Sequence, residues 1–177
     1  MLQIRTLAVI LASAAAATAA ARALMTRTPV GVQPVTGFDV NRYMGDWFEI
    51  ARLNHRFERG LSHVSASYSL NDDGTVKVVN RGRKAGQWKD IKGTARFQGE
   101  PDVASLAVTF FPGFPGGYHV FELSPDYRWA MIAGPNRGYL WILSRGKTMD
   151  EATYQRLVGI ARDKGYDVDG LIRVDHG

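Results

Sequence analysis

Turn-forming residues interrupt the chain from Gly45 to Arg145 roughly every ten to fourteen residues. The clearest break is Asn71-Asp72-Asp73-Gly74, since Asp-Gly fits the positive φ angles of a tight hairpin turn. Further breaks are rich in Gly, Pro and Asp and stand at Arg83–Gln87, Gln98–Pro101, Pro112–Gly117, Ser124–Arg128 and Gly134–Gly138. Breaks this regular predict a meander of antiparallel strands.

The runs between the breaks favour β-branched and aromatic residues, as in "SHVSASYSL", "VASLAVTFF" and "YLWILSR". In the first of these, Val64, Ala66 and Tyr68 alternate with serines, so one face of the strand is apolar. Together with the run that begins at Gly45 there are about eight strands, the number at which a closed sheet encloses one small ligand. The sequence therefore predicts an all-β fold, an eight-stranded up-and-down antiparallel barrel.

A different period follows the strands. Tyr154, Leu157, Val158 and Ala161 recur at helical spacing between residues 148 and 164, which predicts one C-terminal amphipathic helix packed outside the barrel. Thr148 and Glu151 match a capping box, and Gly165 stands where a C-terminal cap is expected. The stretch "DGLIRV" predicts a short final strand.

The N-terminal residues have the pattern of an export signal. A basic start is followed by a nearly continuous apolar run over residues 6–21, with small-x-small sites at Ala17-Thr18-Ala19 and Ala21-Arg22-Ala23. The alternative is an uncleaved, alanine-rich anchor. We expect residues 1–23 to form the signal peptide or anchor, residues 24–37 a linker, and residues 38–177 the barrel domain.

Charge and cysteine content exclude several classes of protein. The formal net charge is +5, but basic residues are scattered among acidic ones, which argues against a nucleic-acid partner. The sequence contains no cysteine, so it offers no disulfide, no thiolate metal ligand, no catalytic thiol and no acylated cysteine.

Two motifs resemble the lipocalin family, and particularly its bacterial envelope branch. Gly45-Asp46-Trp47, after the helix-like "DVNRYM", is similar to the family's G-x-W signature, and "SPDYRWAMIAGPNRGYLWILSR" is similar to the later signature regions that end in an arginine, here Arg145. The resemblance runs from about residue 38 to residue 174. It departs from the branch at the N-terminus, because most members are lipid-anchored through a cysteine that this sequence lacks.

The signature residues Gly45, Trp47 and Arg145 have a structural interpretation. Trp47 should plug the narrow end of the barrel, and the Arg145 guanidinium should lie over its ring as a cation–π contact. Gly45 leaves room for close backbone approach. We therefore assign none of the three to ligand contact.

Strand parity and the resemblance predict the residues that bind ligand. The apolar wall should comprise Ala51, Ala66, Tyr68, Val78, Ala95, Phe97, Val108, His119, Phe121, Ala130, Tyr139 and Trp141. Arg52 and Arg56, with Arg59 and His55, should lie at the open mouth and meet a carboxylate or phosphate head group. Two alternatives stay open: the loop charges pair with Glu58 or remain solvated beside anionic lipid, and the core is filled by its own side chains.

No pattern of residues indicates catalysis or a metal site. His55, His63, His119 and His176 have no metal-ligand spacing, there is no G-x-S-x-G motif, and "PGFPGG" lacks a P-loop lysine. We therefore expect no cofactor and no enzyme activity. A haem or pigment carrier, using His119, and an isomerase- or epoxidase-like enzyme are the alternatives.

The expected function follows from the resemblance. It implies binding and storage or transport of fatty acids or lysophospholipids in the bacterial cell envelope, in the periplasm or at the outer membrane. The expected partner is a small hydrophobic ligand, contact with a membrane surface is possible, and whether the protein forms a homodimer is left open.

Overall fold

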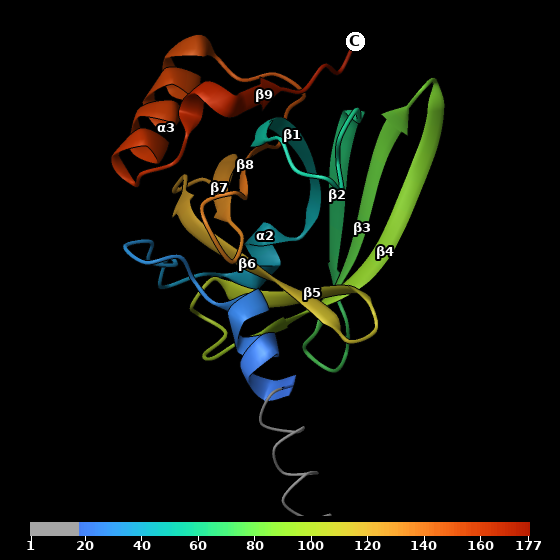
Figure 1. Cartoon of the computed structure of the whole chain (residues 1–177), viewed down its shortest axis with the longest axis vertical. Coiled ribbons are helices and arrows are strands. Elements are labelled where there is room, and N and C mark those ends of the chain that lie inside the picture. Colours follow the sequence, from blue (N-terminus) through green and yellow to red (C-terminus); the bar gives the residue numbers. More distant parts are fainter. Residues whose placement is uncertain (1–17) are drawn as a thin grey trace, which may run out of the picture.

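The computed structural model describes residues 18–177, so most of the expected signal segment lies outside the described residues. Its main feature is an antiparallel barrel of eight strands (Figure 1). The strands are β1 (Gly45–Leu53), β2 (Ser62–Leu70), β3 (Val76–Lys84), β4 (Gln87–Phe97), β5 (Ser105–Phe111), β6 (Phe114–Leu123), β7 (Trp129–Ala133) and β8 (Leu140–Ser144).

The barrel is closed because β1 pairs with both β2 and β8, while every other strand pairs with its neighbour in sequence. This confirms the predicted up-and-down topology. The hairpin predicted at Asn71–Gly74 is present, and the Gly74 N–H donates to the Asn71 carbonyl; of the Asp73-Gly74 pair only Gly74 adopts a positive φ, +76°. The short strand β9 (Leu171–Arg173) pairs with β1, as the sequence indicated.

The C-terminal helix is α3 (Glu151–Asp163), and it packs outside the barrel (Figure 1). The predicted capping box at Thr148 is wrong: Asp150 is the N-cap, and its carboxylate accepts the Thr153 N–H at 2.8 Å. Gly165 follows the last turn with a φ of +80°, as expected for a helix that ends in a left-handed residue.

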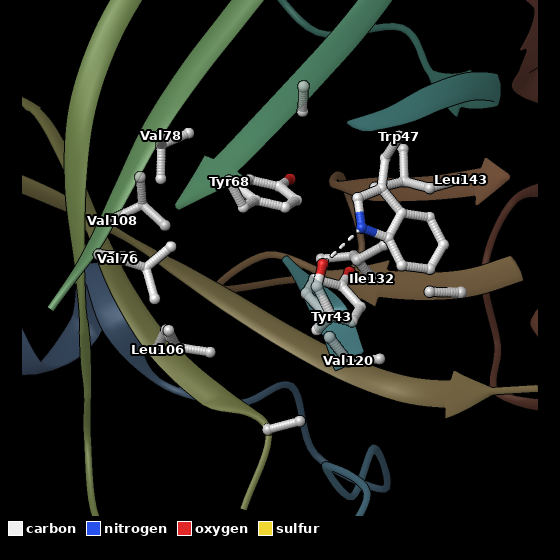
Figure 2. Packing of buried hydrophobic residues seen from close by; sticks show 14 of the residues in the cluster. Tyr43, Trp47, Tyr68, Val76, Val78, Leu106, Val108, Val120, Ile132 and Leu143 are labelled. Carbon is white, nitrogen blue, oxygen red and sulfur yellow. Dashed lines mark hydrogen bonds between the residues drawn. The ribbon is translucent and has the colours of Figure 1, made fainter. Parts of the chain in front are cut away.

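Two apolar clusters lie on opposite sides of the barrel wall. The inner cluster gathers around Trp47 and includes Tyr43 of α2 (Val40–Tyr43) (Figure 2). The outer cluster contains the buried face of α3, from Tyr154 to Ala161, packed on Leu140 and Ile142 of β8. Burial on both faces explains why β7 and β8 are almost uniformly apolar.

β-bulges change which residues face inward. The register of β1 shifts between Glu49 and Ala51, so Ala51 joins the outer cluster and Arg52 points inward. In β6 the inward and outward faces are the reverse of those predicted, since Val120 lies in the inner cluster and Phe121 in the outer one. The predicted inward positions of Ala51 and Phe121 are therefore wrong.

The glycine-rich break at Pro112–Gly117 is shorter than predicted. Only Pro112 and Gly113 form the turn, with Gly113 at a φ of +85°, and β6 already begins at Phe114. Glycine and proline can be part of an antiparallel strand close to a hairpin turn. The composition of this segment therefore predicted a longer loop than the structure has.

The N-terminal part of the described chain runs along the outside of the barrel. Residues 18–26 are helical, and the extended residues that follow bond to β6, where the Val35 N–H donates to the Val120 carbonyl at 2.9 Å. The segment expected as a linker is thus attached to the barrel by hydrogen bonds. Among residues 18–177, no helix combines the length and apolarity that crossing a lipid bilayer requires.

Candidate functional site

One end of the barrel is closed by Trp47, whose side chain is fully buried. Its indole N–H donates to the Tyr43 carbonyl at 2.8 Å, and the Arg145 guanidinium carbon lies 3.9 Å from its ring centroid. Arg145 also donates to the backbone carbonyls of Arg42, Asp46 and Tyr127. The predicted cation–π contact is therefore present, and Arg145 ties three chain segments together beneath the plug.

The inner cluster contains most of the predicted apolar wall. The predicted residues found there are Ala66, Tyr68, Val78, Ala95, Phe97, Val108, Ala130 and Trp141. The inner cluster also contains residues that the predicted wall did not include, namely Tyr43, Tyr118, Val120, Ile132 and Leu143. Tyr118 and Val120 were missed because the parity of β6 was assigned one residue out of step.

The hydroxyl groups of three tyrosines form a small hydrogen-bonded group within this apolar wall. The Tyr118 hydroxyl lies 2.7 Å from that of Tyr43 and 3.0 Å from that of Tyr68. Burial raises the pKa of all three side chains above the ordinary value for tyrosine, so they remain neutral hydroxyls. Neutral hydroxyls that bond to one another leave the surrounding surface suited to an uncharged, apolar chain.

We call the opposite end of the barrel, where the β3–β4 hairpin has its tip (Figure 1), the open end. Ile91 pairs with Asn80 on the inward-facing side of the β3–β4 hairpin, yet 37% of Ile91 is exposed. The loop between β1 and β2, residues 54–61, lies at this end, as the sequence indicated. Ile91 lies in the part of β4 that pairs with β3 but not with β5, so water reaches its inward-facing side chain there.

A buried polar cluster lies inside this open end. Arg52 donates from Nη1 to Glu49 Oε1 at 2.7 Å and from Nη2 to the carbonyls of Glu58 and Leu61 at 2.9 and 3.0 Å. Its Nε lies 3.7 Å from Glu58 Oε2. Arg52 is 1% exposed, so for this arginine the alternative of pairing with Glu58 holds, and it does not stay in solvent.

Aromatic rings surround this polar cluster. The His55 ring lies 5.2 Å from that of Trp141 and 5.3 Å from that of Tyr139, which places the predicted wall residue Tyr139 at the open end. Trp141 donates its indole N–H to Glu58 Oε2 at 3.1 Å, and His55 Nε2 lies 3.3 Å from the same oxygen. Sequence parity could not find this arrangement, because Glu58 and His55 belong to an irregular loop.

Three buried nitrogen atoms of the cluster have no hydrogen-bond partner among the described residues. They are Arg52 Nε and both ring nitrogens of His55, although Arg52 Nε and His55 Nε2 lie 3.7 and 3.3 Å from Glu58 Oε2, within ion-pair distance. Buried polar atoms in folded proteins nearly always have a partner, supplied by protein, water or ligand. His55 Nδ1, which has neither a hydrogen bond nor an ion pair among the described residues, therefore marks where a polar group of a ligand would be accepted.

The two carboxyl groups of the cluster share one guanidinium. Burial, together with the negative charge of Glu58, raises the pKa of Glu49 well above its ordinary value. Burial also opposes ionisation of Glu58, but contacts from His55, Trp141 and Arg52 lower its pKa overall. Glu58 is therefore the ionised partner of Arg52, and Glu49 is the group that readily holds a proton.

The remaining predicted polar residues lie outside this cluster. Arg56 is exposed, with its guanidinium carbon 4.7 Å from the Phe57 ring centroid. The predicted inward position of His119 is wrong: its Nδ1 lies 3.0 Å from Ser105 Oγ, and its Nε2 lies 3.0 Å from the Arg27 carbonyl on the outside of the barrel. Burial lowers the pKa of His119, which favours its neutral form.

Two hollows of the described surface lie outside the barrel. One, of about 400 Å³, separates Arg22 from the outer face of β4 and β5, and another, of about 360 Å³, lies beside Phe48 and His176. Residues 18–177 contain no group of three or more His, Asp or Glu side chains placed to hold a metal ion. The polar cluster with its apolar interior is thus the candidate site.

Known proteins are similar to this chain in fold and in sequence. A family model described as a lipocalin-like domain matches residues 38–176. The outer membrane lipoprotein Blc of Escherichia coli (strain K12) is 47% identical over 165 residues, which cover 90% of this chain and 93% of that protein. Temperature-induced lipocalin-1 of Arabidopsis thaliana is 41% identical over 150 residues, covering 79% of this chain and 80% of that protein.

Among solved structures, insecticyanin from the tobacco hornworm Manduca sexta has a TM-score of 0.65 at 18% identity, over 86% of this chain and 88% of that chain. This likeness concerns the fold alone. Since the family model spans the whole barrel and the relatives are similar over most of their lengths, the chain belongs to the lipocalin family and is a bacterial lipocalin.

Proposed function

We propose that this lipocalin binds a single-chain anionic lipid, a fatty acid or a lysophospholipid, and stores or carries it in the cell envelope without chemical change. The family and the barrel support binding of lipophilic ligands in general. The similarity to proteins named outer membrane lipoproteins supports a place in the envelope. We place this chain in the periplasm or at the outer membrane, exported and not anchored through cysteine, which its sequence lacks.

The observation that carries the proposal is the incomplete hydrogen bonding of Arg52 and His55 under the open end. Arg52 Nε and the His55 ring are buried where an apolar interior begins, so a carboxylate or phosphate there would complete their hydrogen bonds. The acyl chain would then run between the alanines and valines of the wall. Each buried methylene contributes about 0.8 kcal/mol before the cost of ordering the chain.

Head-group recognition is tested with a fatty acid and the alcohol of the same chain length. Both compounds displace a fluorescent fatty acid from the protein, and the ratio of their affinities is measured. We expect the double variant E49M/R52M to lower the acid-over-alcohol ratio about tenfold, the worth of one hydrogen bond to a charged group. The double replacement removes Arg52 together with Glu49, its 2.7 Å partner, while Glu58 keeps contacts with the Trp141 indole N–H and with His55.

A matched control is available outside the barrel. Glu151 and Arg173 form an exposed ion pair with a 2.7 Å contact, and E151M/R173M should leave the ratio unchanged. H55A, which removes the other donor and keeps the ion pair, should also lower the ratio. An unchanged preference for the acid in both E49M/R52M and H55A would show that the head group is not held here.

A further inference from the structure

The β3–β4 hairpin projects beyond the rest of the barrel wall. β4 pairs with β3 along its length, from Gln87 onward, but with β5 only from Thr94 to Phe97. Within the described chain, the edge of β4 from Gln87 to Gly93 has no other strand partner. The hairpin therefore extends past its neighbours at the open end, as Figure 1 shows.

This hairpin is strongly basic. Between Val76 and Phe97 it carries seven basic residues and one acidic residue, Asp90. The basic residues are Lys77, Arg81, Arg83, Lys84, Lys89, Lys92 and Arg96. Asp90 pairs with Arg81 at 3.5 Å. The basic residues nearer the tip of the hairpin therefore have no acidic neighbour within the hairpin.

The loop between β1 and β2 adds further cations beside the hairpin tip. A side chain built at Gly60 would come within 3.9 Å of Lys84, and Ser62 Oγ donates to the Arg83 carbonyl at 3.5 Å. Arg56 and Arg59 of this loop are exposed. The only acid of the loop, Glu58, directs its carboxylate inward to Trp141, so it does not neutralise this surface.

Two exposed aromatic rings accompany these charges. Phe57 is 61% exposed and Trp88 is 50% exposed. Each ring has a guanidinium carbon 4.7 Å from its centroid, from Arg56 and Arg81 respectively. We call the set of Arg56, Phe57, Arg59, Arg83, Lys84, Trp88 and Lys89 the rim surface.

We propose that the rim surface docks on an anionic lipid bilayer and holds the open end of the barrel against it. Basic side chains near such a surface contribute about 1 kcal/mol each, and aromatic rings favour the interfacial layer. Docking in this orientation lets a lipid pass between bilayer and barrel without crossing bulk water. Residues 18–26 leave the barrel at the end away from the hairpin tip (Figure 1), so this contact is separate from any contact made by the N-terminus.

Flotation with lipid vesicles tests the proposal in the full chain. We compare vesicles of neutral phosphatidylcholine with vesicles that also contain phosphatidylglycerol, at low and high salt. The wild-type protein should bind the anionic vesicles, bind the neutral ones at least about tenfold less, and dissociate as salt screens the charges. Equal binding to both vesicles, or no binding to either, would overturn the proposal.

Two variants with the same change in net charge locate the contact. R83E/K84E reverses two rim cations, whereas K77E/R96E reverses two exposed cations of the same hairpin outside the rim surface. R83E/K84E should lower vesicle binding at least about tenfold, and K77E/R96E should change it by less than about threefold. Equal loss in both variants would mean that overall charge, and not the rim, attracts the membrane.

A second readout separates this proposal from the proposed function. Displacement of the fluorescent fatty acid in the absence of vesicles should be the same for R83E/K84E and wild type, since among the described residues neither the Arg83 nor the Lys84 side chain forms a hydrogen bond or ion pair with the polar cluster. F57S/W88S should weaken vesicle binding while preserving its salt dependence, because it removes rings and no charge. If F57S/W88S binds anionic vesicles as wild type does, the rings have no part in docking.

Discussion

At the scale of single residues, Arg145 stabilises the closed end through several interactions at once. It donates hydrogen bonds to three carbonyl groups and covers the Trp47 ring at 3.9 Å. We expect R145Q to lower the free energy of unfolding by about 3 kcal/mol, since hydrogen bonds from a charged donor and the cation–π contact are lost together. Urea denaturation measures this, with R128Q as the exposed control. A loss no larger than that of R128Q would contradict the structural assignment.

The two glutamates of the polar cluster should respond oppositely to substitution. Glu58 has a lowered pKa, so its contribution to stability is present above the ordinary pKa of glutamate and is lost as the pH falls through the folded-state value. E58Q should therefore cost about 2 kcal/mol at neutral pH, and the cost should shrink in acid. Thermal or urea denaturation at several pH values checks this, with E100Q as the exposed control.

Glu49 has a raised pKa, so its protonated form is the one that the fold favours. Its contribution is complete below the ordinary pKa of glutamate and is lost as the pH rises through the folded-state value. Glutamine imitates the protonated acid, so the stability of E49Q relative to wild type should improve as the pH rises. If E49Q instead became relatively less stable with rising pH, Glu49 would be the ionised partner of Arg52.

At the scale of elements, adjacent residues of β3 separate the interior from the outside. Val78 belongs to the inner cluster, whereas Val79 pairs with Ser67 and lies on the other face. V78W should lower the affinity for fatty acid and alcohol alike by at least about tenfold, because the indole occupies space that the acyl chain needs. V79W should leave both affinities unchanged. Equal binding by V78W and wild type would place the ligand elsewhere.

Sequence patterns predicted the strands well where the alternation was uninterrupted. In β2, β4 and β5, period two assigned Ala66, Ala95 and Val108 correctly to the interior. In β1 the bulge after Glu49 turns the Arg52 side chain inward and the Ala51 side chain outward. In β6, His119 and Val120 were assigned to the wrong faces of the strand. A bulge adds one residue without a compositional signal, so periodicity cannot locate it.

At the scale of the whole molecule, the closed end was more predictable than the open end. Trp47 lies in β1 and Arg145 directly follows β8, so their parity could be assigned, and their contact was predicted. The open end depends on the loop between β1 and β2, where His55 and Glu58 meet Trp141 only through tertiary packing. Charge composition indicated a basic loop, but not that one arginine turns inward while its neighbours stay in solvent.

The central claim is that the barrel holds a single-chain lipid. Native mass spectrometry with lipid extraction, on protein purified from its own envelope fraction, tests it most directly. We expect a fatty acid or lysophospholipid to be retained by the wild-type protein and by V79W, and to be absent from V78W. A coloured ligand, or an empty barrel in wild type that also fails to take up added fatty acid, would contradict it.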